Sequence, residues 1–141
     1  MGWGFCIECN SCDYEEYISL GVGMMYCPSF ENLMEFLPSK KRKKILKILE
    51  GRPTPDLVEF SEELFFCPSC RSFHSRLDYT IFCSDDHSSI TPVRFRCKHC
   101  RKKLEKCSEE EANRLKERIR EYPCPKCHEI SLKIGSAMMW D

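Results

Sequence analysis

Hydrophobic and polar residues alternate in several short stretches of the chain, and at three places apolar residues end at or just before a pair of cysteines. In FCIEC, Phe5 and Ile7 fall on one side of an extended chain, and Cys6 and Glu8 fall on the other. A period of two is typical of half-buried strands. LFFCPSC and VRFRCKHC also place their apolar residues just before a cysteine pair, so we expect short strands that lead into cysteine turns. The other expected strands cover residues 13–20, 73–82 and 129–134.

Helical spacing and capping residues predict two helices in the first half of the chain. Ser29 is placed to cap a short helix over residues 30–37, which ends at the following proline. Ser39 is placed to cap a second helix over residues 40–50, with Gly51 in the stop position. Apolar residues of the second helix recur at helical spacing and are expected to face the core: Ile45, Leu46, Ile48 and Leu49.

A third helix is expected in the last third of the chain. Ser108 and Glu111 have the spacing of a capping box, and Pro123 ends the helix just before a cysteine. The apolar residues between them form one narrow stripe: Ala112, Leu115, Ile119 and Tyr122. The chain closes with MMWD, and we expect its apolar residues to pack as a tail: Met138, Met139 and Trp140.

The cysteine content indicates a scaffold held together by metal or by disulfides. Twelve of the 141 residues are cysteine, near the level that marks such scaffolds. Residues 1–20 lack the basic and apolar segments of a secretory signal, and no apolar run approaches the roughly 18 residues of a membrane span. We therefore expect a cytoplasmic protein. Because disulfides are rare in the cytoplasm, metal binding is favoured over a disulfide framework.

Four independent Cys-x-x-Cys pairs can be drawn, which is enough for two four-cysteine sites. Four thiolates in a tetrahedron suit Zn²⁺, so two Zn²⁺ ions are expected. The segment between Cys100 and Cys124, residues 101–123, is close in length to the spacer of about 15–20 residues found in zinc ribbons. This spacing favours one site of Cys9, Cys12, Cys67 and Cys70 and a second site of Cys97, Cys100, Cys124 and Cys127. The alternative joins the two middle pairs and leaves the two outer pairs without a partner.

The opening segment offers three cysteines, of which a metal site needs two. We expect Cys9 and Cys12 to be the ligands, because the strand then runs into its turn as it does at the other pairs. Cys6 would lie inside the strand. The cysteines left over are expected to behave as small buried hydrophobes: Cys6, Cys27, Cys83 and Cys107. The alternatives are a redox-active thiol, or a further metal site in which Cys83 joins His87.

Together these elements predict a small α+β protein stabilised by metal, made of two zinc-ribbon units, each with a four-cysteine site, rubredoxin-like knuckles and short antiparallel strands. The first unit would cover residues 1–85 and carry a helical insert over about residues 21–62. The second would cover residues 86–141 and carry one helix. Units of this size bury little apolar surface, so bound metal would decide whether each one folds.

The motifs resemble those of a group of small bacterial proteins, largely uncharacterised, that are built from two four-cysteine zinc ribbons. The resemblance is carried by FxIxCxxCxY from Phe5 to Tyr14 and by LGVGM, LFFCPSC, RCKHC and the terminal MMWD. It implies the two-ribbon fold and supports Cys9 and Cys12 as ligands, but it implies no activity. The chain departs from usual ribbon turns, which place glycine after the second cysteine because φ is often positive there. The residues in that position are Asp13, Arg71, Arg101 and His128.

We expect no enzymatic activity. A four-cysteine site leaves no open coordination position, and the chain has no HExxH, Gly-rich phosphate loop or GxSxG motif. His99 and His128 lie in or beside cysteine turns and are expected to donate hydrogen bonds to the ligating sulfurs. An iron tetrathiolate or thiol-based redox protein is the alternative from another class, because four sulfurs also suit iron.

Two basic segments, residues 40–47 and 94–106, are candidates for binding an anionic partner. The alternatives are that each is a solvated face, or that the cations of the second segment offset the thiolate charge of a four-cysteine site. The formal net charge is zero, so the argument depends on these local patches. The first segment occupies a helix N-terminus, where the helix dipole disfavours cations, and an anionic partner would offset that cost. The expected anion-binding residues are Lys40, Lys41, Arg42, Lys43, Lys44, Arg94, Arg96, Lys98, Arg101 and Lys102.

The sequence thus predicts a non-enzymatic zinc-binding protein that acts as a binding module for nucleic acid or for an acidic protein surface. The alternative function is an adaptor or subunit of a protein complex with no nucleic-acid role. Neither a membrane nor a small-molecule substrate is indicated.

Overall fold

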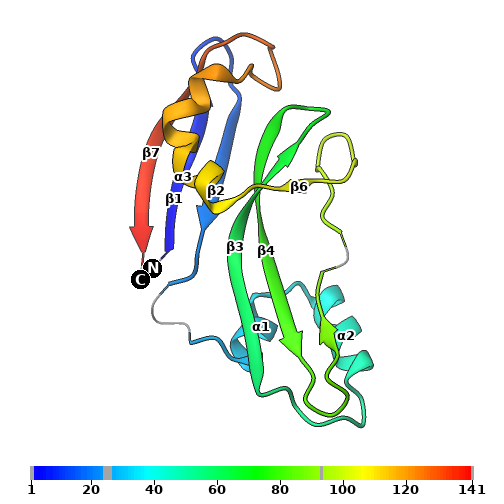
Figure 1. Ribbon diagram of the computed structural model, residues 1–141. Helices are drawn as coiled ribbons and strands as arrows, with labels where there is room; N and C mark the ends of the chain where they lie inside the picture. Colours follow the sequence, from blue (N-terminus) through cyan, green and yellow to red (C-terminus); the bar gives the residue numbers. More distant parts are fainter. Residues whose placement is uncertain (1, 24–26, 93, 141) are drawn as a thin grey trace.

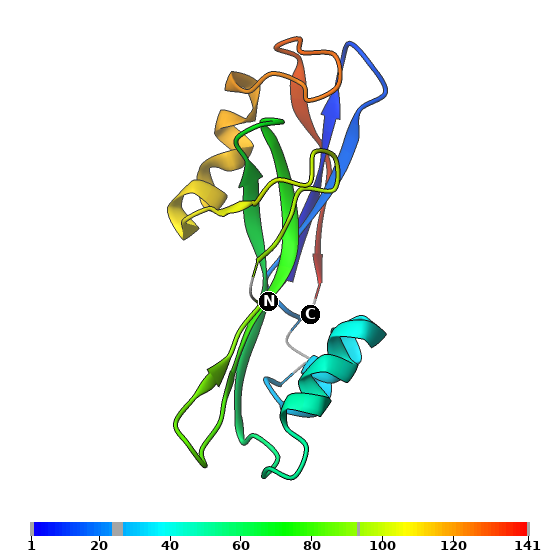
Figure 2. The ribbon, with the colours of Figure 1, turned by 90° about the vertical axis from the view of Figure 1, so that its right-hand side faces the viewer.

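The computed structural model describes residues 2–23, 27–92 and 94–140, and it arranges them in two antiparallel sheets with three α-helices (Figure 1). The molecule is elongated. Its two sheets lie side by side in one half, and the second sheet continues into the other half, where it meets two of the helices (Figure 2). No helix among the described residues is both long and apolar enough to cross a membrane.

The first sheet has the strand order β2–β1–β7 and joins the two ends of the chain. The central strand β1 (Gly2–Cys9) pairs antiparallel with β2 (Glu15–Leu20) and with β7 (Leu132–Trp140). As a result the N- and C-termini lie next to each other (Figure 1). Phe5 and Ile7 are buried in the main core, as their alternation with polar residues predicts.

The second sheet has the order β5–β4–β3–β6 and is built on one long hairpin. Strands β3 (Leu57–Cys67) and β4 (Ser72–Phe82) pair without a break from Leu57↔Phe82 to Cys67↔Ser72, so the hairpin closes at a cysteine turn. Strands β5 (Ser89–Ile90) and β6 (Glu105–Lys106) add two residues each at the edges. The hairpin connects the two halves of the molecule (Figure 2).

Helices α1 (Phe30–Phe36) and α2 (Ser39–Ile48) lie at the end of the hairpin farthest from its turn (Figure 2). Ser29 caps α1 as predicted, because its hydroxyl accepts a hydrogen bond from the backbone N–H of Asn32 at 3.1 Å. The expected cap at Ser39 is wrong. Ser39 is the first residue of α2, Pro38 precedes it in the cap position, and no side chain caps the helix. Proline fits there because its fixed φ suits the start of a helix.

The apolar face of α2 is narrower than expected. Ile45 and Leu49 are buried in the second core cluster, against the hairpin and α1. Leu46 and Ile48 are exposed, which corrects their expected place in the core. Ile45 and Leu49 are four positions apart and therefore lie on the same side of the helix. Leu46 and Ile48 lie to either side of that line and are exposed.

Helix α3 (Glu109–Arg118) is followed by a single 3₁₀ turn, η1 (Ile119–Glu121), and both pack on the first sheet. The predicted capping box is present. The backbone N–H of Glu111 donates to the Ser108 hydroxyl at 3.1 Å, and the N–H of Ser108 donates to the Glu111 carboxylate at 2.7 Å. Leu115 and Ile119 are buried against β1 and β2, which confirms the apolar stripe.

Two expected elements differ from the structure. The segment VRFRC was expected to be a strand. Val93 lies outside the described residues, and the described residues 94–97 form only an isolated bridge, between Arg96 and Lys103. The apolar tail belongs to β7, where the Met138 and Met139 side chains are 60% and 72% exposed rather than packed. These two methionines lie on the outermost strand of the sheet, with no further strand beside them among the described residues.

The sheets cross the boundary that was expected between residues 85 and 86. Strand β7 from the end of the chain pairs with β1, and β6 pairs with β3. Each sheet is therefore built from segments on both sides of that boundary. These two pairings, of β7 with β1 and of β6 with β3, determine which cysteines meet.

Candidate metal centres

The first cysteine tetrad joins the turn after β1 to the turn before β7. It consists of Cys9, Cys12, Cys124 and Cys127, whose sulfur atoms all lie within 4.8 Å of one another. The Cys9 and Cys127 sulfurs are 3.6 Å apart, and the Cys12 and Cys124 sulfurs are also 3.6 Å apart. Cys9 and Cys124 are buried, and the other two are partly exposed.

The second tetrad joins the closing turn of the β3–β4 hairpin to the loop that precedes β6. It consists of Cys67, Cys70, Cys97 and Cys100, again within 4.8 Å. The Cys67 and Cys100 sulfurs are 3.5 Å apart, and the Cys97 and Cys70 sulfurs are 4.0 Å apart. Here too the first cysteine of each pair is buried, and the second is partly exposed.

These distances are those of a tetrahedral metal site. With metal–sulfur bonds of about 2.3 Å, the edges of an S₄ tetrahedron are about 3.8 Å long. The four sulfur–sulfur distances given above, from 3.5 to 4.0 Å, lie close to that edge. Both tetrads are therefore geometrically suited to hold a metal ion.

The expected grouping of the cysteine pairs is wrong, although each of the eight expected ligands belongs to a tetrad. Cys9 and Cys12 meet Cys124 and Cys127, not Cys67 and Cys70. The cause is the pairing of β1 with β7, which aligns Cys9 with Leu132 and lets the Asn10 N–H donate to the Ser131 carbonyl at 2.9 Å.

The two middle pairs meet for a similar reason. Strand β6 pairs with β3 just before the hairpin turn, with Phe65 opposite Lys106 and Phe66 opposite Glu105. The loop before β6 is thereby brought over Cys67 and Cys70. This is the pairing that the alternative described for the middle pairs, but the outer pairs are not stranded, because they form the first tetrad.

All four turns share one pairing between their ends. The first cysteine of each turn is hydrogen-bonded or paired with the residue five positions later, as in Cys124 N–H to the Glu129 carbonyl at 2.8 Å. Backbone N–H groups also point at the sulfurs, for example Lys126 N–H to Cys124 at 3.4 Å and His99 N–H to Cys97 at 3.4 Å. Such donors stabilise thiolates over thiols.

The residue after the second cysteine has a positive φ in three of the four turns. The values are 56° for Arg71, 65° for Arg101 and 65° for His128, and each N–H donates to the carbonyl of the first cysteine. Asp13 is not in this region. The turns therefore keep the shape that glycine usually serves, and each non-glycine residue there costs about 1–2 kcal/mol.

One thiol in each tetrad is already predisposed to ionise. A hydrogen bond with the Ser131 hydroxyl, 3.0 Å from the sulfur, is the main cause that lowers the pKa of Cys9 to about 6. A backbone N–H at Lys102 is the main cause that lowers the pKa of Cys100 to about 7. A metal ion arriving at either site therefore meets a thiolate near neutral pH.

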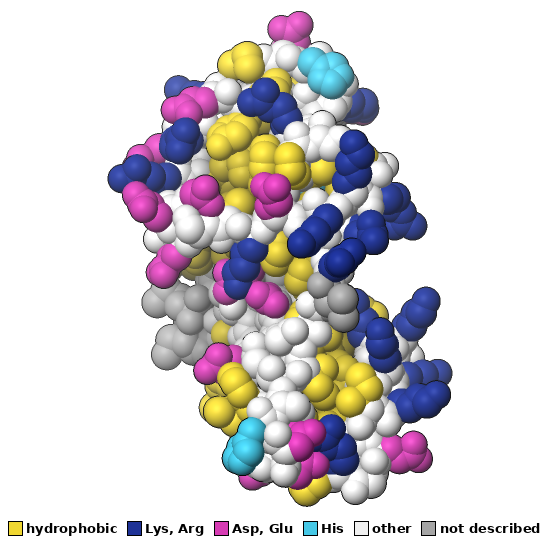
Figure 3. Space-filling view, turned by 45° about the vertical axis from the view of Figure 1, so that its right-hand side comes forward, with side chains coloured by type: hydrophobic (Ala, Val, Ile, Leu, Met, Phe, Trp, Pro, Cys, Tyr) yellow, Lys and Arg dark blue, Asp and Glu magenta, His cyan; other side chains and the backbone are white. Residues whose placement is uncertain are grey.

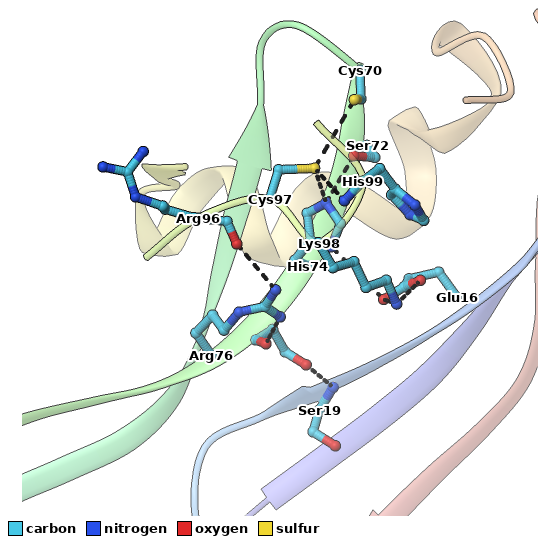
Figure 4. Close-up of polar contacts among 11 residues, drawn as sticks. Glu16, Ser19, Cys70, Ser72, His74, Arg76, Arg96, Cys97, Lys98 and His99 are labelled. Carbon is cyan, nitrogen blue, oxygen red and sulfur yellow. Dashed lines mark hydrogen bonds and ion pairs between the residues drawn. The ribbon is translucent and has the colours of Figure 1, made fainter. Parts of the chain in front are cut away.

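A buried histidine supports the second tetrad (Figure 4). The Nε2 atom of His74 lies 3.7 Å from the Cys97 sulfur and 2.7 Å from the Ser72 hydroxyl. Its Nδ1 atom has no hydrogen-bond partner among the described residues and lies 3.8 Å from the Glu16 carboxylate. Burial lowers the pKa of His74 to about 4, so the ring is neutral at physiological pH.

The hydrogen bonds expected from the His99 and His128 side chains to the sulfurs are not formed. Neither the His99 nor the His128 side chain is hydrogen-bonded to a cysteine sulfur in the described part of the chain, and both are exposed. His74 was passed over because it lies in a strand, four residues beyond Cys70. His74 is two positions after Ser72 in β4, so both side chains lie on the same side of the strand, next to the cysteine turn. This spacing is the sequence signal that could have identified His74.

The four remaining cysteines have different surroundings. Cys6 and Cys83 are buried, Cys107 is partly buried and Cys27 is exposed, so the expectation of burial is wrong for Cys27. The Cys6 sulfur lies 3.3 Å from the Glu15 carboxylate and belongs to neither tetrad, as expected.

Cys83 lies near two carboxylates rather than forming a site with His87. Its group contains Asp85 and Asp86. Arg52 occupies both carboxylates, with its guanidinium 2.7 Å from Asp85 and 2.9 Å from Asp86. The two ion pairs with Arg52 therefore account for the gathering of these carboxylates beside Cys83.

The two basic segments lie on one face of the molecule. The Lys41 ammonium sits over the Phe95 ring at 5.1 Å from its centre, so α2 directly contacts the loop of the second tetrad. Figure 3 shows Lys and Arg side chains gathered along the right-hand side of both halves of the molecule, with few acids among them. Lys98 differs from its neighbours because its ammonium pairs with the Glu16 carboxylate at 2.7 Å.

A cleft of about 310 Å³ separates the two tetrads. Its walls come from the turns of both: Tyr14, Pro125 and Lys126 from the first, and Cys70 and His99 from the second. The Lys98–Glu16 ion pair spans the same junction, because Glu16 belongs to β2 and Lys98 to the second tetrad's loop (Figure 4).

Comparison of the chain with protein-family models, with curated proteins and with solved structures finds no match. The resemblance to bacterial two-ribbon proteins therefore stays a prediction. The functional argument depends on the geometry of the two tetrads and on the charge around them.

Proposed function

We propose that this protein is a non-enzymatic zinc-binding module that binds nucleic acid through a basic face, formed by α2 and the loop over residues 94–102. The observation that carries the proposal is the contact of Lys41 with Phe95, which unites two basic segments that are far apart in the sequence. Phosphate neutralisation by such cations releases counterions and supplies most sequence-independent affinity for nucleic acid.

The charge of the metal centres makes the local gathering of cations more significant. A Zn²⁺ ion with four thiolates carries a charge of −2, because +2 and −4 are summed. The chain has a formal net charge of zero with neutral thiols, so two occupied sites would bring it to −4. Attraction to a polyanion must then come from the face around α2 and the loop over residues 94–102.

The tetrads support a structural role for the metal rather than catalysis. Four protein ligands close the coordination sphere, whereas catalytic zinc keeps one position open. Zinc is the proposed ion because it accepts four thiolates in a tetrahedron and holds small domains together. Cysteine must be reduced to bind zinc or iron, which favours a reducing compartment such as the cytoplasm.

The experiment measures binding of the zinc-loaded full chain to oligothymidylate and to a DNA duplex of equal length at several salt concentrations. Lys40→Glu with Lys44→Glu should lower the affinity about tenfold and flatten the salt dependence, because these lysines share one face of α2. Arg114→Glu with Arg120→Glu makes the same change in net charge outside this face and serves as the matched control.

Equal losses in the two double variants would refute a specific basic face. Failure of the wild-type chain to bind either probe would favour the adaptor function, in which an acidic protein surface occupies the face. Metal analysis and colour distinguish a zinc protein from the alternative of an iron tetrathiolate redox protein, because Zn²⁺ centres are colourless and ferric tetrathiolate is coloured.

A further inference from the structure

We propose that the cleft between the two tetrads binds an unpaired base of a single-stranded nucleic acid, while the basic face holds the adjacent phosphates. This inference rests on the proposed function and narrows it from nucleic acid in general to single strands. It assigns a ligand class to Tyr14 and His99, which lie on opposite turns and line one cleft.

The size of the cleft suits a single ring system. Its volume of about 310 Å³ lies at the lower end of the range of about 300–1,000 Å³ for small-molecule sites. A flat base can enter such a space, whereas a paired duplex cannot. Bases become available for this kind of insertion only where the nucleic acid is unpaired.

The chemistry of the walls also suits a base. Tyr14 is half-buried and packs on one side against the main core, His99 is exposed, and both line the cleft, to which Pro125 adds apolar surface. Stacking on aromatic rings is the usual way in which proteins hold unpaired bases without reading their sequence. The His99 side chain is not hydrogen-bonded to a ligating sulfur in the described residues, and its ring packs on one side against the His74 ring, with the ring centroids 5.9 Å apart.

Charge decides which part of a nucleotide enters the cleft. The thiolate turns of both tetrads repel a phosphate, whereas a neutral base is not repelled. Lys126, the cation that lines the cleft, is paired with the Asp13 carboxylate. Cations lie along the same loop as His99. Lys102 reaches across to the opposite turn of the second tetrad, where its ammonium lies 3.1 Å from the Ser69 hydroxyl, and Arg101 is exposed next to it.

The cleft and the basic face also share one loop. His99 belongs to the loop over residues 94–102, and Phe95 of that loop carries Lys41 of α2. A strand whose phosphates follow α2 and this loop would therefore bring one of its bases to the cleft. Aromatic surface beside a cationic track is the general arrangement of proteins that bind single strands.

The test compares two anionic probes with the zinc-loaded full chain: oligothymidylate of about 10 nucleotides, and inorganic polyphosphate, which has phosphates but no bases. The test variant is His99→Ala, and the matched control is His128→Asn. His128 is an exposed histidine beside a cysteine turn that does not line the cleft, and asparagine tolerates its positive φ. Metal analysis confirms that each variant retains two ions.

We expect His99→Ala to lower the affinity for oligothymidylate about tenfold, as for loss of one stacked base, and to leave the affinity for polyphosphate unchanged. His128→Asn should change neither. If His99→Ala weakens both probes equally, the residue contacts phosphate and the base site is refuted.

If His99→Ala changes neither affinity while the Lys40→Glu/Lys44→Glu variant weakens both, the base site fails and the proposed function stands. Failure of the wild-type chain to bind either probe overturns both proposals together.

Discussion

The sulfur atoms of Cys9 and Cys127 lie 3.6 Å apart, although 118 positions separate the two residues in the chain. The first tetrad therefore fastens the first strand to the last one, and the main core lies directly beside it, since Cys9 and Cys124 are part of that core. Closing so long a loop costs chain entropy before any contact forms. Metal binding at this site is thus coupled to the docking of the whole C-terminal segment.

Paired cysteine substitutions test which turns share an ion. Cys12→Ser or Cys67→Ser alone should leave one of two metal ions per chain, because a tetrad with three sulfurs loses most of its affinity. Cys12→Ser combined with Cys124→Ser should still leave one ion, since both residues belong to the first tetrad. Cys12→Ser combined with Cys67→Ser should leave none. Elemental analysis after gel filtration distinguishes these results, and one remaining ion in the last variant would restore the grouping expected from spacing.

Cys6 provides a test of the ligand choice in the opening segment. Its sulfur is hydrogen-bonded to Glu15 rather than placed in a tetrad, and a serine hydroxyl can form a similar bond. Cys6→Ser should keep both metal ions and lower the free energy of unfolding by about 1 kcal/mol. Cys9→Ser is the control, and it should lose one ion. Retention of both ions by Cys9→Ser would show that Cys6 can serve as the ligand.

Local features of this fold could be predicted from the sequence because neighbouring residues determine them. The capping box of Ser108 and Glu111, the cap at Ser29 and the alternation of Phe5 and Ile7 are all present. The grouping of the cysteines could not be predicted from spacing, because it depends on β1 pairing with β7 at the opposite end of the chain.

The side chains that contact the ligating sulfurs could not be predicted for the same reason. His74 reaches Cys97 only because the loop before β6 folds over the hairpin, and Ser131 reaches Cys9 only because β7 lies beside β1. Neither contact follows from the residues next to a cysteine pair. The contact between Lys41 and Phe95 is equally distant in sequence, so the sequence predicted two basic segments but not a single face.

The turn backbones provide a stability test. Arg71 has a φ of 56°, so Arg71→Gly should raise the free energy of unfolding of the metal-loaded protein by about 1 kcal/mol by relieving the left-handed conformation. Asp13 occupies the equivalent position without a positive φ. Asp13→Gly should therefore lower the free energy of unfolding by about 0.5–1 kcal/mol, because glycine adds freedom to the unfolded chain. Denaturant titration measures both changes, and the same sign for the two variants would contradict the difference between these turns.

Thiol labelling tests the surroundings of the four cysteines outside the tetrads. In the metal-loaded protein at pH 8, we expect maleimide to modify about one thiol per chain quickly, and that thiol is the exposed Cys27. Burial, with the nearby Glu15 and Glu8 carboxylates, raises the pKa of Cys6 to about 11. Burial, with Glu111 and Glu105, raises the pKa of Cys107 to about 12. At pH 8 both remain almost entirely protonated, and the protonated thiol is not the nucleophile.

Cys83 should also react slowly, because its side chain is 4% exposed. The matched variant is Cys27→Ser, in which fast labelling should disappear while both metal ions remain bound. Unfolding the chain in denaturant with a chelator should then make every remaining cysteine reactive, which confirms that none is blocked by a disulfide. Fast modification of Cys6 or Cys107 in the native protein, identified by peptide mass spectrometry, would show that the first sheet or the α3 junction opens at neutral pH.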